Sequence, residues 1–147
     1  MTNSKVAQDA PIAAEWIARM LVGEGYCLNF SIDSLHEIDR FFDEHAVMGK
    51  ARSGGLLADD LGRRIFSLGS YVGEVIGRES GGIVRWRGND SDPRAEINLA
   101  MILENGLQFW PIQKAMKRFR NGKDDSIHLY GLAITESSRS NALHQGL

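Results

Sequence analysis

A glycine-rich stretch between residues 62 and 77 contains the residues most open to a chemical role. Gly69 and Gly73 are four positions apart, and Glu74 follows directly. On a helix this spacing puts both glycines on one face. There the bare backbone either lets another segment approach closely or forms the floor of a pocket. Close packing is the more frequent use of such a face. The alternative hypothesis is a ligand pocket in which Gly69, Gly73 and Glu74 bind, with Glu74 as an acid, a base or an anchor.

Basic side chains gather in a second segment, residues 114 to 123, where five of ten residues are Lys or Arg and none is acidic. A solvated helix face is the usual reason for such a run. The alternative is a surface for an anionic partner, extended by the arginines of a nearby strand. The candidate partner-binding residues are Lys114, Lys117, Arg118 and Arg120 of the helix, and Arg85 and Arg87 of the strand.

An acidic protein partner, or self-association as a dimer, fits this surface better than nucleic acid does. The net charge of the chain is −2 and its isoelectric point is about 6.1. Nucleic-acid-binding domains normally combine a basic isoelectric point with exposed aromatic side chains among the basic ones. Here the aromatic residues fall on apolar stripes, so we expect RNA to be a minor option.

The signatures of common catalytic classes are missing from the sequence. It contains no Gly-x-x-x-x-Gly-Lys phosphate loop and no Gly-x-Ser-x-Gly nucleophile elbow. The four histidines include no pair at i, i+3 or i, i+4 that would place two metal ligands on one helix face. We therefore expect no catalytic residue of these classes, no bound metal and no cofactor.

Cysteine use and hydropathy favour a cytoplasmic protein. Cys27 is the single cysteine, so no disulfide can form within the chain, which suits a reducing compartment. The first ten residues are polar and do not resemble a signal peptide. No stretch has the roughly 18 consecutive apolar residues of a membrane-spanning helix, so we expect no membrane contact.

Hydrophobic periodicity predicts the elements that position these residues. Apolar residues recur at helical spacing over about 12–21, 35–42, 57–76, 112–119 and 127–134, and alternate over 83–87. Asp9 with Pro11 is a predicted helix start, Ser31 a predicted N-cap, and Asp124 or Asp125 caps the last helix. The third helix is expected over about 56–79, after a mobile basic loop at 49–55.

Asn105-Gly106 is a hairpin signal between two further strands, expected at 95–103 and 107–110. A two-residue turn places Ile102 opposite Phe109 and Met101 opposite Trp110. Both faces of the hairpin are then apolar, so we expect both to be covered.

Together these elements predict an α+β fold, with a small antiparallel β-meander packed against about five helices. The 147 residues are 43% hydrophobic, which is the size and composition of a single globular domain. We expect a single domain over 1–147, with a folded core at about 10–135 and a flexible tail at 136–147.

Four short motifs resemble those of uncharacterised bacterial proteins of the domain-of-unknown-function class. These are a Ser-capped helix start, a Gly-x-x-x-Gly-Glu-Val-Ile helix, a strand with two leading glycines and a tryptophan, and a basic helix ending in Asn-Gly. They lie at Ser31–Leu35, Gly69–Ile76, Gly81–Trp86 and Lys117–Ser126. The resemblance implies a compact single domain of bacterial origin and no activity that could be transferred.

The sequence thus favours a non-enzymatic binding or regulatory domain that contacts another protein. The alternative is a small-molecule-binding domain, or an enzyme, with a pocket beside the glycine-rich helix 62–77.

Overall fold

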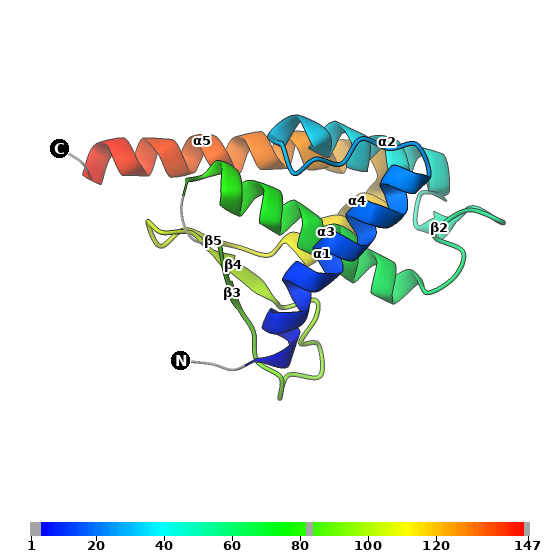
Figure 1. Cartoon of the computed structure of the whole chain (residues 1–147), viewed down its shortest axis with the longest axis horizontal. Coiled ribbons are helices and arrows are strands. Elements are labelled where there is room, and N and C mark those ends of the chain that lie inside the picture. The colour runs from blue at the N-terminus through cyan, green and yellow to red at the C-terminus, as the bar shows by residue number, and fades with distance from the viewer. Residues whose placement is uncertain (1–3, 82–83, 146–147) are drawn as a thin grey trace.

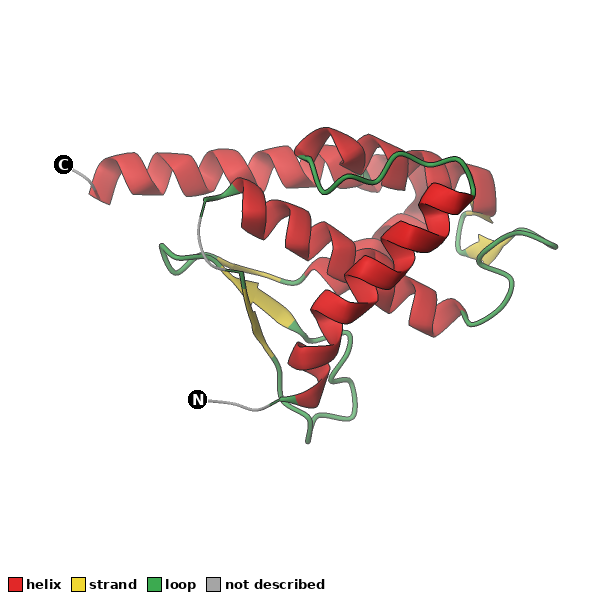
Figure 2. Ribbon diagram, in the orientation of Figure 1, coloured by secondary structure: helices red, strands yellow, loops and turns green. Residues whose placement is uncertain are grey.

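The computed structural model describes residues 4–81 and 84–145, and its fold is α+β, as the sequence predicts (Figures 1 and 2). Within these residues five α-helices and two short 3₁₀ helices accompany two small antiparallel sheets. The helices are α1 (Lys5–Gly23), η1 (Ile32–Ser34), α2 (Leu35–His45), α3 (Leu61–Glu79), α4 (Pro111–Asn121), η2 (Gly122–Asp125) and α5 (Ile127–Gln145). The strands are β1 (Ala46–Val47), β2 (Lys50–Ala51), β3 (Arg85–Arg87), β4 (Ala100–Ile102) and β5 (Gln108–Phe109).

Helix α3 is the centre of the domain, because every residue from Ile65 to Gly77 is buried. Helix α1 crosses it in front in Figure 1, and α2 and α5 run side by side along the top. The three-stranded sheet packs on the C-terminal half of α3, where Met101 approaches Gly77. No helix within the described residues is long and apolar enough to cross a bilayer.

The β3-β4-β5 meander differs in register from the prediction. Met101 pairs with Phe109 and Ile102 with Gln108, so the turn has three residues instead of two. Its third residue, Gly106, has φ +92°, which suits a three-residue hairpin with a left-handed last position. The shift by one residue puts Trp110 beyond the strand end, where it is 39% exposed. The expectation that both hairpin faces are covered is therefore wrong at Trp110.

The expected strand over 95–103 is shorter than predicted. Residues 91–98 form turns, in which the Ala95 amide donates to the Asp92 carbonyl and the Asn98 amide to the Arg94 carbonyl. Pairing then starts at Ala100. These turns lie beside α4, where the Gln113 side chain donates to Asn98.

Helices α1 and α5 begin where distant carboxylates accept their free amides. Ser4 is the N-cap of α1, and the Asp90 carboxylate accepts from the Lys5 and Val6 amides at 2.6 and 3.2 Å. The Asp39 carboxylate accepts from the Ile127 and His128 amides at 2.9 and 3.0 Å. The predicted starts at Asp9 and at Asp124 or Asp125 are therefore wrong. These partners lie more than 80 residues away, beyond the reach of local capping rules.

Three further segments differ from the prediction. The segment expected as a mobile loop at 49–55 contains β2, which pairs with β1, and the Gly49 amide donates to the Phe119 carbonyl at the end of α4. Helix α3 starts at Leu61 rather than near residue 56. At the other end of the chain, α5 continues to Gln145 where a flexible tail from 136 was expected.

Candidate functional site

Helix α4 divides its residues between a buried face and an outer face. Ile112, Ala115 and Phe119 are buried, and Ile112 lies directly against α3 at Gly69. Lys117 and Arg120 are exposed. Pro111 at the first position of the helix fits its missing amide hydrogen, and Trp110 precedes it as the N-cap residue. The outer face of α4 therefore starts at an exposed tryptophan and continues into basic residues.

Three adjoining hollows, of which the second and third are lined by Trp110, have volumes of about 400, 280 and 250 Å³. The first lies between α4 and the 94–98 turns, the second between α4 and α5, and the third over the outer face of the sheet. Asn98 lines the first and third hollows, Gln113 and Lys117 line the first and second, and Trp110 lines the second and third. We call this surface the Trp110 face, defined by Arg87, Arg94, Asn98, Gln108, Trp110, Gln113, Lys117 and Arg120.

Four cations of the Trp110 face, contributed by three parts of the chain, are available to a partner. Arg87 comes from β3, Arg94 from the turns before β4, and Lys117 and Arg120 from α4. None of the four forms an ion pair with any residue in the described ranges. The face therefore presents uncompensated positive charge around an aromatic side chain.

Asp92 is the one acidic side chain among the described residues that line the three hollows, and its oxygens are engaged within the protein. The Asn98 amide donates to it at 2.8 Å and the Arg94 backbone amide donates at 2.8 Å. These two hydrogen bonds lower the pKa of the Asp92 carboxyl. Asn98 also accepts from the Gln113 side chain at 3.2 Å, so a chain of hydrogen bonds holds the turns against α4.

Lys114 lies at the edge of this surface and is partly engaged. Its ammonium donates to the Asp125 carboxylate at 3.0 Å and lies 5.3 Å from the centre of the Tyr130 ring. The Asn121 amide and then Lys114 lower the pKa of Asp125, which keeps this pair ionised. Lys114 is thus less available to a partner than Lys117 and Arg120 are, because its charge is already paired with Asp125.

Arg118 is not part of the surface, and this corrects the expectation for it. The side chain is buried, with its Nε donating to Asp39 Oδ1 at 2.9 Å and an Nη donating to Asp43 Oδ1 at 2.7 Å. The same Nη donates to the Asp39 carbonyl. Arg118 therefore joins α4 to α2, and its charge is paired with carboxylates inside the protein.

The arginines of β3 lie on the side of the sheet where Trp110 emerges. Arg85 and Arg87 are exposed, while Trp86 between them points to α3. Arg87 lines a hollow of the Trp110 face, and Arg85, two pairs further along the strand, extends the positive charge beyond it. The structure thus brings Arg87, Lys117 and Arg120 together.

Sequence reasoning missed the centre of this face. Trp110 was assigned to a covered hairpin face, and Asn98 to a strand, while Gln113 received no role. The available signal was Pro111. A helix that starts directly after Trp110 ends the strand at this point. The alternation of covered side chains along the hairpin then no longer applies to Trp110.

The glycine face of α3 is packed, which corrects the pocket hypothesis for Gly69, Gly73 and Glu74. A Cβ on Gly69 would lie 2.5 Å from the Ile112 Cα, and one on Gly73 would lie 2.3 Å from the Trp86 ring. Glu74 is 4% exposed, and its carboxylate accepts from Trp86 Nε1 at 2.8 Å and from Arg78 at 3.1 Å. These three residues thus hold β3 and α4 against α3, as close packing predicts.

Within the described part of the chain, no three His, Cys, Asp or Glu side chains are grouped closely enough to hold a metal ion. Comparison of the sequence and the structure with protein-family models, curated proteins and solved structures gave no match. The resemblance to bacterial proteins of the domain-of-unknown-function class therefore stays a prediction.

Proposed function

We propose that this protein is a non-enzymatic binding domain whose Trp110 face docks on an acidic segment of a partner protein. The observation that carries the proposal is the exposed Trp110 ring among four cations without an internal ion-pair partner in the described residues. Tryptophan and arginine are the residue types that most often dominate the energy of a protein interface.

The shape of the face supports a protein partner. Hollows of 250 to 400 Å³ adjoin one another around a protruding ring, so side chains of a partner can enter on each side of Trp110. Charge of one sign on the rim raises the association rate with an acidic partner and disfavours a basic one. A net charge of −2 for the whole chain argues against a polyanion such as RNA, since the chain outside the Trp110 face holds more acidic than basic residues.

The test is the double charge reversal Lys117→Glu with Arg120→Glu. Both side chains are exposed, so the fold is expected to tolerate the change. We expect binding to a fluorescent Asp- and Glu-rich peptide that contains one aromatic residue to be lost, and binding of the wild type to weaken as salt is added. Trp110→Ala is expected to weaken the same complex by about tenfold or more, a loss of roughly 1.4 kcal/mol.

Lys123→Glu is the matched control, because Lys123 is an exposed basic residue of η2 outside the Trp110 face. It changes the net charge in the same direction without touching the proposed surface. Equal loss of binding in this variant contradicts the proposal. Single-stranded RNA of equal length serves as the competitor, and tighter binding to RNA than to the peptide also contradicts it.

Self-association is the alternative use of the same face. Native mass spectrometry of the tagged protein, purified gently from its source cells, separates the two uses. A dimer that dissociates in the double charge-reversal variant supports self-association, and a stoichiometric acidic protein lost in that variant supports the heterologous partner. A cytoplasmic location for this encounter is part of the proposal and is favoured by the single, free Cys27.

A further inference from the structure

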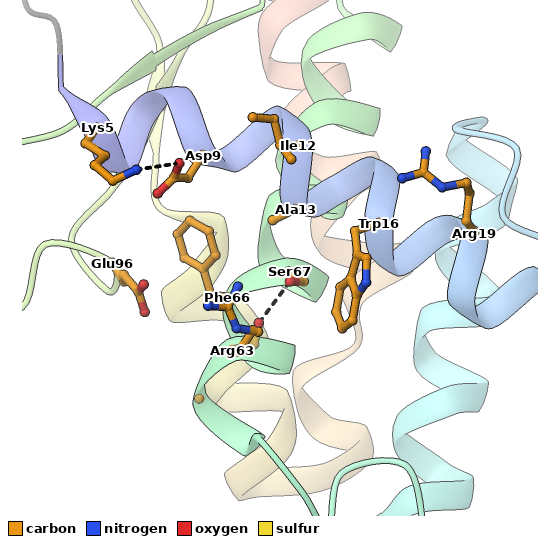
Figure 3. A pocket seen from close by; sticks show the side chains of 11 residues that line it. Lys5, Asp9, Ile12, Ala13, Trp16, Arg19, Arg63, Phe66, Ser67 and Glu96 are labelled. Carbon is orange, nitrogen blue, oxygen red and sulfur yellow. Dashed lines mark hydrogen bonds and ion pairs between the residues drawn. The ribbon is translucent and has the colours of Figure 1, made fainter.

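A fourth hollow lies away from the Trp110 face, between α1 and the first half of α3 (Figure 3). Its volume is about 700 Å³, larger than any of the three hollows around Trp110. Small-molecule sites typically measure about 300 to 1,000 Å³. We call it the α1–α3 groove. It borders the glycine-rich helix at Gly62, four residues before Phe66, and not at Gly69 or Gly73.

Two aromatic side chains enter the groove from opposite helices. Trp16 projects from α1 and is 37% exposed, and Phe66 projects from α3 with Ala13 between them (Figure 3). Ile12, 68% exposed, completes an apolar rim. A flat ring system placed here would pack against the exposed part of Trp16 and reach Phe66, which is 6% exposed, at its accessible edge.

Two cations that line the groove, Arg63 of α3 and Arg19 of α1, form no ion pair with a described residue. Lys5 pairs with Asp9 at 3.6 Å, so these two charges offset each other (Figure 3). Arg63 is exposed and forms no ion pair with any described residue. Ser67 is not available to a ligand as a donor, because its hydroxyl donates to the Arg63 carbonyl at 2.9 Å. Arg63 lies beside Gly62 in the first turn of α3, so of these two cations it is the one that can bind an anion together with the backbone of that turn.

The first turn of α3 lies beside Arg63 and leaves backbone amides without a side-chain cap, while the Asp60 carboxylate offsets part of the helix dipole. Asp60, the N-cap residue, has φ +52° and its side chain accepts no capping hydrogen bond from a described residue. Gly62 lines the groove, and a Cβ added there would meet no described atom within 4 Å. An anion can thus approach the backbone amides of this turn closely, where the helix dipole also favours negative charge.

Glu96 limits how much negative charge the groove accepts. It lines the groove from the turns before β4, where it is exposed, and it repels a polyanion while accepting a hydrogen bond from a ring N–H or a hydroxyl (Figure 3). We propose that the α1–α3 groove binds a small planar aromatic ring system that carries one anionic group, as nucleoside monophosphates and aromatic carboxylates do. The ring packs against Trp16 and Phe66, and the anion meets Arg63 and the Gly62 amide. This site is independent of the Trp110 face.

Titrations followed by ¹H–¹⁵N NMR test the proposal. The probes are AMP and indole-3-acetate as two sources of an aromatic anion, adenosine as the ring without the anion, and inorganic phosphate as the anion without the ring. Trp16→Phe and Trp110→Phe assign the indole signals. We expect AMP or indole-3-acetate at millimolar concentration to shift the Trp16 indole and the Gly62 amide, leaving the Trp110 indole in place. Which of the two binds identifies the source of the anion.

Adenosine and phosphate are each expected to bind at least about tenfold more weakly than AMP if AMP is the ligand type. Arg63→Gln is expected to weaken the aromatic anion by about tenfold or more, and Lys117→Gln on the other face serves as the matched exposed control. The proposal is overturned if neither aromatic anion shifts the groove signals, if phosphate or adenosine alone binds as tightly, or if Arg63→Gln binds like the wild type.

Discussion

Arg118 and Arg120 lie two residues apart on α4, yet their guanidinium groups have opposite surroundings. Arg118 is buried and bonded to Asp39 and Asp43 of α2, 79 and 75 residues earlier in the chain. Arg120 is exposed and lines a hollow of the Trp110 face. One charge of the basic run thus holds two helices together, while its neighbour remains available to a partner.

This difference shows what a run of charges in a sequence means. The helical period alternates the residues of α4 between the core and the solvent, so the run 114–123 serves two purposes at once. A buried ion pair is costly to break, because the remaining charge loses its partner in a poorly hydrated place. An exposed cation costs the fold little, and its removal changes only what the surface attracts.

The largest expected effect is on the buried side. Arg118→Met leaves Asp39 and Asp43 without their guanidinium, so we expect the free energy of unfolding to fall by about 3–5 kcal/mol. Urea denaturation followed by circular dichroism measures the loss. Lys117→Met, on the outer face one residue earlier, is expected to change stability by less than about 0.5 kcal/mol. Similar losses in the two variants would remove the distinction between the faces.

Gly69→Ala tests the contact on which the buried face of α4 rests. The new methyl group meets the Ile112 backbone at 2.5 Å, so α3 and α4 must separate. We expect a loss of about 1–3 kcal/mol despite the higher helix propensity of alanine. Gly62→Ala in the same helix has open space around it, and a gain of up to about 1 kcal/mol is expected. Thermal unfolding of both variants measures the expected loss of stability in Gly69→Ala and the expected gain in Gly62→Ala.

The third prediction concerns pH. His128 stacks on His36 with ring centres 3.5 Å apart, and burial followed by repulsion from His36 lowers the pKa of His128, against the smaller opposing effects of Asp33 and Asp39. The unfolded chain then binds a proton at a higher pH than the folded chain does. Stability contributed by His128 is therefore present above about pH 6.5 and lost as the pH falls below it.

The slope from this group is at most about 1.4 kcal/mol per pH unit. Glu37, whose pKa the Arg40 side chain and the Cys27 amide lower to about 2, contributes only at more acidic pH. His128→Gln is expected to flatten stability measured between about pH 6.5 and 5 relative to wild type. If the slope of stability against pH is unchanged in that variant, His128 is not the source of the acid sensitivity. His45 is then the next residue to replace, since burial lowers its pKa as well.

The smallest expected change in stability is at the Trp110 face. Lys117→Glu with Arg120→Glu is expected to unfold within about 0.5 kcal/mol of wild type in urea. The same variant is the one expected to lose an acidic partner. A large loss of stability here would mean that these cations make structural contacts, and the outer face of α4 would then resemble the inner one.

Local signals in the sequence predicted much of the fold. Period 3.6 stripes located the helices, and the Asn105-Gly106 pair located the hairpin. The exact register was wrong, because Glu104 joins the turn and one extra residue shifts every later side chain to the other face. That shift is why Trp110 was assigned to a covered face.

Features set by distant residues were beyond sequence reasoning. Lys117 and Arg120 were predicted to be surface cations from composition, whereas the burial of Arg118 depends on Asp39, a residue of α2. Glu74 looked reactive in isolation, yet Trp86 Nε1 and Arg78 occupy its carboxylate. The α1–α3 groove escaped notice because Trp16 was assigned to an apolar stripe and Phe66 was given no role.

The Asp90 carboxylate at the start of α1 has a consequence for synthesis of the chain. Helix α1 is complete once Gly23 has been translated, and Ser4 caps it locally, but its first two amides find their acceptor at Asp90, and its apolar stripe packs on α3. On the ribosome the first helix therefore waits, with the Lys5 and Val6 amides unpaired and with Ile17 and Leu21 exposed, until the chain has emerged at least as far as Asp90. A chaperone that binds apolar segments would find its earliest opportunity there.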